Sequence, residues 1–579
     1  MPGSGGINTD SPPWAIKSDQ AISLVDGVPL NGTISQRRGW TYATQPVPSV
    51  GDVDSHGQHI FRIGDRRKAC VAIAGNKVYV QDDAGDWQAV FDINATISPA
   101  DGGVLPQYVP RGMYHDELIL CPVDGEYPVL RWAGANGASY TVANGAYTSE
   151  RDTVAGTFSG GGIAMYWNPE PEAQITSSLK AVEHSPTLLT LEQFFPKASD
   201  TLIQPGGKSF VSAVGATWPG QKVYEVGRLT GIAGQTASFD GAVFVGSEAK
   251  WGGVIVASQA TARASDFVPA SAAAASVFAD GLMVERKIGD AYTWTIHPIV
   301  AAAANSLTIP AGVAPANITG RYAILRRMAC SDVAVRDGSV FYGGNKQHPS
   351  RVWFSAPSWN PALPAAFGPT FGFPLQSFTS EDDFLLNWIE VPADGDGDTI
   401  VALVESDGPV IVLKQNSAHS LTGTYPAIKQ TLLSNNAGCI DVRSAIDQRG
   451  YGSFWCGRSG IYAYRFGNIT DITSDRVGDE WRERIRLYDP AFGSSVTCGI
   501  FSGFLFVAAH LTDGVTTDDF TWMCNLSSGA WTEMSNMPLR SMQNVRTLDG
   551  NEKLLGTLYG DKRAVDISQI TRGDVTDGN

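Results

Sequence analysis

Short apolar runs joined by tight polar turns dominate the hydrophobic pattern of the chain. In a typical unit, a run rich in Val, Ile, Tyr and Trp leads to a turn of Gly, Asn or Asp, and a second apolar run follows. Asp337-Gly338 and Ser502-Gly503 are two such turns. This arrangement predicts β-hairpins, because these residues accept the backbone angles of tight turns. The unit recurs at residues 69–80, 112–132, 330–354, 399–422, 440–472, 496–533 and 543–568.

The repetition predicts an all-β protein, and specifically a β-propeller of about seven blades, with a range of about six to eight. Units of roughly 35 to 45 residues that each supply three or four strands match the period of propeller blades. A single four-stranded sheet cannot bury both faces, so blades pack face to face around an axis. A β-sandwich uses the same hairpins and is the alternative, but it rarely needs so many similar units.

Residues 136–328 interrupt this repeat. The stretch is richer in Ala, Ser and Thr, and three consecutive glycines at 160–162 punctuate it. We therefore predict an N-terminal segment with the first blades over 1–135, one or two inserted β-barrels or sandwiches over 136–328, and the remaining blades with a C-terminal segment over 329–579. Such an insertion is tolerated because the entropy of closing a loop grows slowly with its length. The alternative is further blades with poorly matching sequence.

One short helix is predicted near residues 475–487. Ser474 precedes it as a capping residue, and acidic side chains follow in the first turn, as helix N-termini favour. Val477, Trp481 and Ile485 are spaced by four and would share one face. We expect this face to dock on a blade.

The charge balance is acidic, with 42 Lys and Arg against 58 Asp and Glu among 579 residues and a formal net charge of −16. A general nucleic-acid binder would instead cluster basic residues against phosphates. An acidic wall would still let DNA slide past without holding it. The seven cysteines are scattered singly, without a CxxC pair, which predicts buried thiols and neither a disulfide framework nor a zinc site.

Neither the first residues nor the longest apolar stretches have the pattern of a targeting or membrane segment. The first residues lack the apolar core of a secretory signal, so we expect none. The longest apolar stretches, around 267–278 and 299–304, are short and Ala-rich. They fall well below the about 20 residues that span a bilayer, so we expect no membrane span.

Two motifs resemble ligand-binding loops and depart from their patterns. Residues 205–209 read Pro-Gly-Gly-Lys-Ser, like the end of a phosphate-binding loop, but Leu202 stands where the first Gly belongs. Residues 394–398 alternate three aspartates as a calcium loop does, with Glu405 at the twelfth position, but Thr399 replaces the Gly required at the sixth. We leave open whether Asp394 to Asp398 bind calcium.

The remaining motifs are weaker. His56 and His59 lie near two aspartates and would need a helix to share a metal, whereas Gly57 and the local polarity indicate a loop. Ser459 resembles a nucleophile elbow, but Ile461 replaces its final Gly. Residues 83–87 form one partial box of the type repeated in propeller sialidases. We therefore assign no catalytic, cofactor-binding or metal-ligating residue, and expect no cofactor and no enzyme activity.

Residues 351–361 read Arg-Val-Trp-Phe-Ser-Ala-Pro-Ser-Trp-Asn-Pro. This run resembles a blade segment of tailed-bacteriophage tail proteins with a β-propeller, in which Arg, an apolar residue, an aromatic residue, Phe and Ser precede Pro or Asn-Pro. Residues 459–485, and residues 25–40 with Arg37-Arg38-Gly39, are similar to further segments of that family. The family includes the nozzle of short-tailed phages and minor tail proteins of long-tailed phages. The resemblance covers about 20–40 and 330–490 and does not extend to 136–328.

The resemblance implies a structural component of the distal tail, nozzle or tail tip, located in the virion and made in the host cytoplasm. Such a subunit would form a homo-oligomeric ring or axial assembly with other tail proteins. It would line or cap the DNA exit path without specific DNA binding and would be placed to contact the host surface.

Two other functions remain as alternatives. A propeller that binds or cleaves host-surface glycans could use some of the 15 Trp and 18 Tyr as stacking platforms. Filling blade cores is the commoner use of these residues. A bacterial extracytoplasmic scaffold or sensor is the third hypothesis, and the missing signal segment weighs against it.

Overall fold

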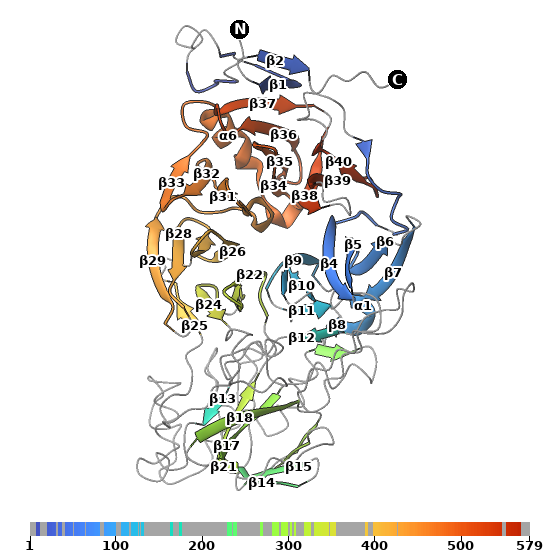
Figure 1. The fold of residues 1–579 in the computed structure, drawn as a ribbon, viewed down its shortest axis with the longest axis vertical. Helices are drawn as coiled ribbons and strands as arrows, with labels where there is room; N and C mark the ends of the chain where they lie inside the picture. Colours follow the sequence, from blue (N-terminus) through green and yellow to red (C-terminus); the bar gives the residue numbers. More distant parts are fainter. Residues whose placement is uncertain are drawn as a thin grey trace.

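The computed structural model is an all-β protein in which four-stranded antiparallel sheets surround a common centre (Figure 1). Among the described residues, seven of these sheets are blades of a β-propeller, which confirms the fold class and the expected number of blades. The structure describes residues 7–11, 20–21, 23–30, 33–36, 41–49, 51–63, 65–81, 86–99, 106–114, 117–125, 127, 129–132, the strands between 163 and 325, 329–346, 348–354, 388–391, 398–424, 427–535, 537–546 and 552–568.

The first four blades follow one another along the chain, apart from the interruption between the second and the third. Blade 1 consists of β4 (Ser55–Ile63), β5 (Asp65–Ala74), β6 (Lys77–Gln81) and β7 (Trp87–Asp92). Blade 2 consists of β9 (Tyr108–Tyr114), β10 (Glu117–Pro122), β11 (Leu130–Trp132) and β12 (Ile163–Met165). Blade 3 consists of β22 (Asp332–Arg336), β23 (Ser339–Gly343), β24 (Arg351–Phe354) and β25 (Trp388–Glu390). Blade 4 consists of β26 (Ile400–Glu405), β27 (Val410–Lys414), β28 (Ala418–Thr422) and β29 (Lys429–Ser434).

The last three blades complete the circle. Blade 5 consists of β30 (Ile446–Gln448), β31 (Gly452–Cys456), β32 (Ile461–Arg465) and β33 (Asn468–Asp471). Blade 6 consists of β34 (Ser495–Phe501), β35 (Phe504–Thr512), β36 (Thr517–Asn525) and β37 (Ala530–Met534). Blade 7 consists of β38 (Leu539–Arg546), β39 (Glu552–Leu558), β40 (Ala564–Asp566) and, from the other end of the chain, β3 (Thr41–Tyr42).

The ring is closed by pairing between the two ends of the chain. The first strand of each blade contacts the first strand of the next, and β38 contacts β4. In blade 7, Thr41 lies opposite Asp566 and Tyr42 opposite Val565. The Tyr42 hydroxyl donates to Asp561 at 3.0 Å, and the Arg563 guanidinium carbon lies 3.3 Å from the centre of the Tyr42 ring. An N-terminal strand therefore completes the C-terminal blade as its outermost strand and pairs with β40, which would otherwise be an open edge.

The hairpin turns have the conformation that the sequence predicts. Asp337 and Gly338, between β22 and β23, have φ values of 50° and 78°. Ser502 and Gly503, between β34 and β35, have φ values of 49° and 82°. Positive φ at both central residues is the type I′ geometry, whose twist matches that of the flanking strands. These turns set the register of each hairpin locally, which is why the pattern was readable along the chain.

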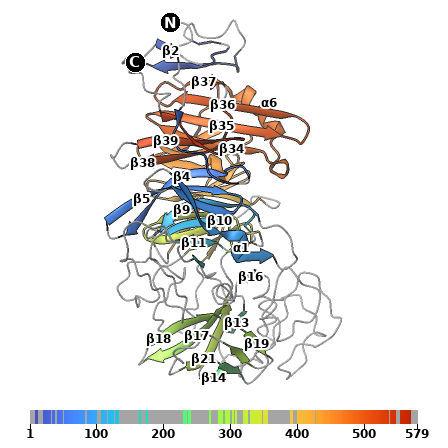
Figure 2. The ribbon, with the colours of Figure 1, turned by 90° about the vertical axis from the view of Figure 1, so that its right-hand side faces the viewer.

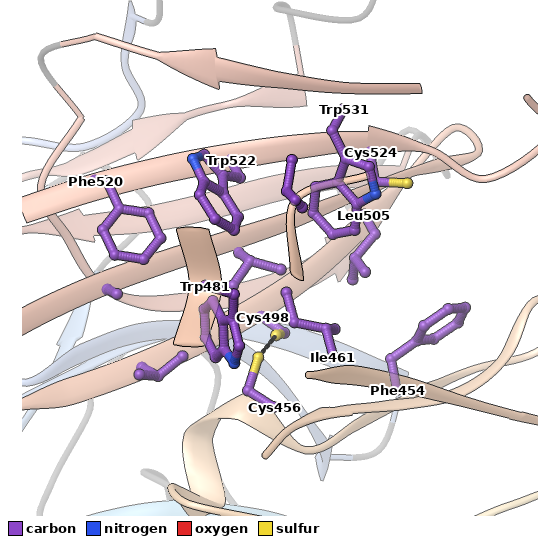
Figure 3. Close-up of a cluster of buried hydrophobic side chains, with 14 of the residues drawn as sticks. Phe454, Cys456, Ile461, Trp481, Cys498, Leu505, Phe520, Trp522, Cys524 and Trp531 are labelled. Atoms are coloured by element: carbon purple, nitrogen blue, oxygen red, sulfur yellow. Dashed lines mark hydrogen bonds between the residues drawn. The ribbon is translucent and has the colours of Figure 1, made fainter. Parts of the chain in front are cut away.

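Apolar side chains from neighbouring blades fill the space between the blades. Between blades 5 and 6, Phe454 and Ile461 from one sheet meet Leu505 and Trp522 from the other, and all four are at most 1% exposed (Figure 3). Similar clusters lie between blades 2 and 3, 3 and 4, 4 and 5, and 6 and 7. At these five boundaries, the blades are thus stabilised mainly by burying apolar side chains against each other.

The predicted helix is present and docks as expected. It consists of α6 (Gly478–Arg484) followed by the 3₁₀ turn η8 (Ile485–Leu487). Val477, Trp481 and Ile485 are at most 3% exposed and belong to the cluster between blades 5 and 6. The Trp481 indole N–H donates to the Gly457 carbonyl at 2.9 Å. In the described part of the chain, no helix is long and apolar enough to cross a membrane.

The cap of α6 is not the one predicted. Val477 occupies the N-cap position, and the backbone N–H of Ser474 instead donates to Asp471 at 3.2 Å in the preceding turn. The carboxylate of Asp10 supplies the cap, accepting the backbone N–H groups of Gly478 at 3.1 Å and Asp479 at 2.7 Å. An acceptor from a distant part of the chain can replace a local one, because the first N–H groups of a helix have no partner within the helix and any nearby oxygen can accept from them.

The N-terminal segment runs along the outside of blade 6. The Ile7 N–H donates to the Trp531 carbonyl at 2.8 Å, and Val25 forms a parallel bridge with Glu533. A two-stranded hairpin of β1 (Gly27–Leu30) and β2 (Thr33–Gln36) follows, at the edge of the ring shown at the top of Figure 1. A further 3₁₀ turn, η9 (Pro490–Phe492), precedes β34.

The described strands between blades 2 and 3 form sheets of their own at the opposite end of the molecule (Figures 1 and 2). One sheet has the order β13 (Ala173–Ile175), β21 (Ile318–Leu325), β17 (Gly281–Ile288), β18 (Ala291–Pro298). The other has the order β14 (Leu229–Ala233), β15 (Thr236–Phe239), β20 (Ser306–Thr308), β19 (Ala301–Ala303).

Two details connect this region to the ring. A short helix, α1 (Ile93–Thr96), leads into β8 (Ile97–Pro99), which pairs with β16 (Phe267–Pro269). In addition, β12 pairs with β11 and belongs to blade 2. The fourth strand of that blade therefore falls within the range 136–328 that the sequence analysis assigned to the insertion.

Candidate functional site

A cavity of about 380 Å³ lies among the inner strands of the propeller. Its walls come from the start of blade 1 at residues 54–55, from β9 at residues 109–112, from the 3₁₀ turn η7 (Val442–Ser444) and the start of β30, from β34, and from β38 at residues 541–543. Inner strands of five blades thus converge on one space, as expected where blades surround an axis. The charged side chains that line it are Asp54, Arg111 and Arg443.

Arg111 belongs to a group of residues that joins three blades. Its Nε lies 3.3 Å from the Ser331 carbonyl and 3.8 Å from the Asp332 carboxylate. The other oxygen of Asp332 accepts the backbone N–H of Leu403 in blade 4 at 2.7 Å. Burial raises the pKa of Asp332 to about 6, although Arg111 and the Leu403 N–H oppose the shift, and burial also lowers the pKa of Arg111. Burial therefore disfavours the charged forms of both Arg111 and Asp332, because each loses contact with water.

Arg443 forms the corresponding group on the other side of the ring. Its Nε lies 3.4 Å from Asp441, whose second oxygen accepts the backbone N–H of Val496 in blade 6 at 3.0 Å. Burial disfavours the charge of Arg443, but Asp441 more than offsets this and leaves the pKa of Arg443 above its usual value. The two arginines thus reach the same cavity from blades 2 and 5.

The third charged wall residue, Asp54, is neutralised by Arg540. The two side chains lie 2.9 Å apart, and Asp54 is 7% exposed. Burial raises the pKa of Asp54 even though Arg540 opposes the shift. This pair joins blade 7 to the segment that leads into blade 1, at the same junction that β3 closes.

A repeated sequence signal marks two of these residues, and the sequence analysis missed it. Asp332 and Asp441 each follow a cysteine two positions earlier; Asp332 is the first residue of the inner strand β22, and Asp441 caps the turn η7 that leads into the inner strand β30. The Cys330 thiol donates to the Asp332 carbonyl at 3.3 Å, and the Cys439 thiol donates to the Asp441 carbonyl at 3.2 Å. In both copies the carboxylate accepts a backbone N–H from the inner strand of the next blade. The Cys-x-Asp repeat therefore locks adjacent blades together.

The calcium hypothesis receives no support from the described residues. Asp394 and Asp396 lie outside them. Both oxygens of Asp398 are engaged by the chain itself, with the Asn416 N–H at 3.0 Å and the Ser417 hydroxyl at 2.8 Å. Asp398 and Glu405 flank the extended strand β26, which places them roughly 20 Å apart because a strand rises about 3.3 Å per residue. These two residues therefore cannot share one ion.

The other sequence candidates do not converge. His56 and His59 lie in β4, so the loop indicated by Gly57 is wrong, because ladder pairing with β5 over the whole strand determines the local structure. The side chains of these histidines lie outside the described set, as do residues 205–209. The Ser459 hydroxyl contacts the Tyr462 hydroxyl at 2.9 Å in the turn between β31 and β32. Over the residues whose side chains are described, no group of three metal-ligating side chains forms.

The seven cysteines are free thiols, and all are buried except the partly buried Cys70. The prediction of buried thiols is thus confirmed for six of the seven cysteines. Cys456 in blade 5 and Cys498 in blade 6 lie with their sulfur atoms 3.5 Å apart within the apolar cluster (Figure 3). Burial raises the pKa of Cys456 well above its usual value, so the thiol stays protonated.

No protein-family model and no curated protein matches the chain. Among solved structures, the chain is similar to PorZ, a bacterial surface component of the type-IX secretion system of Porphyromonas gingivalis, at 11% identity and a TM-score of 0.20, over 91% of this chain and 65% of PorZ. It is similar to the extracellular domain of the hybrid two-component system BT4673 of B. thetaiotaomicron at 10% identity and a TM-score of 0.19, over 94% of this chain and 58% of that domain. For YCF48 bound to D1 peptide the identity is 8% and the TM-score 0.23, over 61% and 96% of the two chains. The fold of this chain is thus established by its own strand order: a seven-bladed β-propeller, in the part that the structure describes, closed by its N-terminal strand.

Proposed function

We propose that this protein is a structural component of a bacteriophage tail, in which the propeller serves as a rigid mount for neighbouring subunits. The observation that carries the proposal is the closure of the ring. Strand β3 completes blade 7, and the Asp10 carboxylate caps α6 at the boundary between blades 5 and 6. The N-terminal segment is thus fixed to the ring at two places, which suits a part that has to transmit force without opening.

The segments that resemble phage tail proteins support the same proposal. Residues 339–354 form β23 and β24 of blade 3, and residues 459–485 form β32, β33 and α6 at the blade 5–6 boundary. These two segments are structural parts of the ring, whereas the described part of residues 25–40 forms the separate hairpin of β1 and β2. The resemblance therefore concerns the framework of the protein, which is what a shared mechanical role would preserve.

The size of the central cavity limits how such a subunit could relate to DNA. A volume of 380 Å³ corresponds to a cube roughly 7 Å on a side. A DNA duplex does not fit such a space, because its major groove alone is about 12 Å wide. A DNA path in the assembled tail would therefore run between subunits or beside them, and the ring of one chain would contribute its outer surface.

The proposal is tested on purified virions and on the isolated chain. Quantitative mass spectrometry of density-purified virions should find the chain in a fixed ratio to the capsid protein, and immunogold labelling should mark the end of the tail. The recombinant full-length chain should form rings or stacked assemblies in light scattering and negative-stain micrographs.

Two results would contradict the tail assignment. One is the absence of the chain from purified virions that remain infectious. The other is a monomer that binds or depolymerises host polysaccharide, which would favour the glycan-directed alternative. A matched panel of capsular polysaccharides with a neutral dextran control separates that outcome from nonspecific adhesion.

A further inference from the structure

The wall of the central cavity is more basic than the protein around it. The chain carries a net charge of −16, yet the charged side chains on the wall are two arginines and one aspartate. The aspartate, Asp54, forms an ion pair with Arg540 at 2.9 Å. Asp332 and Asp441 pair with the two arginines but are not themselves among the lining residues. The space therefore faces two guanidinium groups whose carboxylate partners sit outside the lining.

Both arginines use only part of their hydrogen-bonding capacity for the protein. Within the described residues, the side-chain hydrogen bonds of Arg111 and Arg443 run through Nε. The Nη2 atom of Arg111 is buried and has no hydrogen-bond partner in the described part of the chain. The Arg111 side chain is 8% exposed, so bulk water does not readily satisfy this donor. A buried guanidinium donor without an acceptor is destabilising, and a turn of the Arg111 side chain toward an oxygen anion in the cavity would relieve that cost.

We propose that the central cavity binds a small oxyanion, a carboxylate or a phosphate group, between Arg111 and Arg443. The terminal nitrogens of a guanidinium form a planar fork that matches two oxygens of such a group. The cavity volume of 380 Å³ accommodates an oxyanion together with several waters, since a water molecule takes about 30 Å³. The two arginines come from blades 2 and 5, so the anion would join opposite sides of the inner ring. The proposal does not depend on the tail assignment.

Isothermal titration calorimetry of the full-length chain tests the proposal directly. Inorganic phosphate and acetate are titrated separately at constant ionic strength, with sodium chloride as the matched blank. The expected result is saturable binding at one site for at least one of the two anions. The ranking of phosphate against acetate distinguishes a tetrahedral from a planar ligand. Heat that rises without saturation, or that equals the chloride blank, would mean an adventitious ion only and would overturn the proposal.

A matched pair of variants locates the site. Arg443→Gln removes a wall guanidinium and should weaken binding by about tenfold or more, as expected for a charged hydrogen-bonded pair. Arg482→Gln makes the same change on α6, where the side chain is 46% exposed, and should leave the affinity unchanged. Equal affinity in both variants would place the anion elsewhere and refute the assignment.

A second measurement separates loss of binding from loss of folding. Arg443→Lys keeps the charge but loses the planar fork, so we expect an affinity between those of wild type and Arg443→Gln. Far-UV circular dichroism at each titration temperature shows whether each variant is folded. A folded Arg443→Gln variant with wild-type affinity would overturn the proposal. If Arg443→Gln does not fold, a folded Arg443→Lys variant that binds the anion with wild-type affinity would overturn the proposal.

Discussion

Replacing Trp481 with Ala should destabilise the ring more than any comparable surface change. The side chain is fully buried between blades 5 and 6, where its ring lies 6.2 Å from Phe520 and 6.0 Å from Trp522. Truncating a buried Trp to Ala costs about 3–5 kcal/mol. The substitution also removes the donor for the Gly457 carbonyl, and a buried carbonyl without a partner adds about 1 kcal/mol or more. We therefore expect a loss of about 4–6 kcal/mol.

A second variant at position 481 separates packing from hydrogen bonding, and a surface variant serves as the control. Trp481→Phe keeps an aromatic ring but loses the indole N–H, so its cost should be about 2 kcal/mol, well below that of Trp481→Ala. Phe466→Ala is the control, because Phe466 is fully exposed at the turn after β32 and should change the free energy of unfolding by no more than about 0.5 kcal/mol.

Urea unfolding followed by far-UV circular dichroism gives the three free energies, provided the slopes agree. A cost below about 1 kcal/mol for Trp481→Ala would refute the packing argument. Equal costs for Trp481→Phe and Trp481→Ala would refute the division between the ring and its hydrogen bond.

Three further predictions concern the closure, the cap and the pH dependence. Tyr42→Ala removes the contacts with Arg563 and Asp561 and should speed proteolysis of the N-terminal segment, while Tyr42→Phe, which keeps the ring, should have a smaller effect; equal rates in all three proteins would be inconsistent with this closure. Asp10→Ala should increase amide exchange at the start of α6 by the equivalent of about 1–2 kcal/mol, and unchanged exchange would show that Asp10 is not the cap. Because burial raises the pKa of Asp332 from 3.8 to about 6, the folded state takes up a proton first, so stability should fall as the pH rises from about 4 through about 6. Unfolding measured across this range should show a weaker slope in Asp332→Asn, and an identical slope would assign the titration to other groups.

The blades were predictable because their signals are local. Turns such as Asp337-Gly338 combine residues that accept positive φ with apolar runs on both sides, and these features need no knowledge of distant contacts. The face of α6 was readable for the same reason, since Val477 and Trp481 are neighbours on one helix face. The closing strand was not readable. Thr41–Tyr42 is two residues long, and its partner β40 lies at the other end of the chain.

The site was harder to predict than the fold because its members are ordinary residues until the ring brings them together. Arg111 and Arg443 stand in unrelated sequence surroundings, and neither belongs to a recognised motif. The pairing of Asp332 and Asp441 with their cysteines was visible as a repeat, but its meaning depends on the inner strand of the next blade, which only the closed ring supplies. The cap of α6 shows the same limit, since Asp10 is 468 residues from Gly478.

The closed ring and the contacts of Asp332 and Asp441 with the next blade should make the propeller move as one rigid body. Opening any of the five boundaries from blade 2 to blade 7 would expose an apolar cluster such as the one around Trp481, and at two of them it would also separate a buried carboxylate from its backbone donor. These costs fall on neighbouring blades at once, because each blade depends on the next for the burial of its faces. Among the described strands, the inserted region meets the ring through β12, the fourth strand of blade 2, and through the pairing of β8 with β16, whereas its two four-stranded sheets pair with no strand of a blade. We therefore expect the ring to carry the load and the inserted sheets to make the contacts that distinguish one neighbour from another.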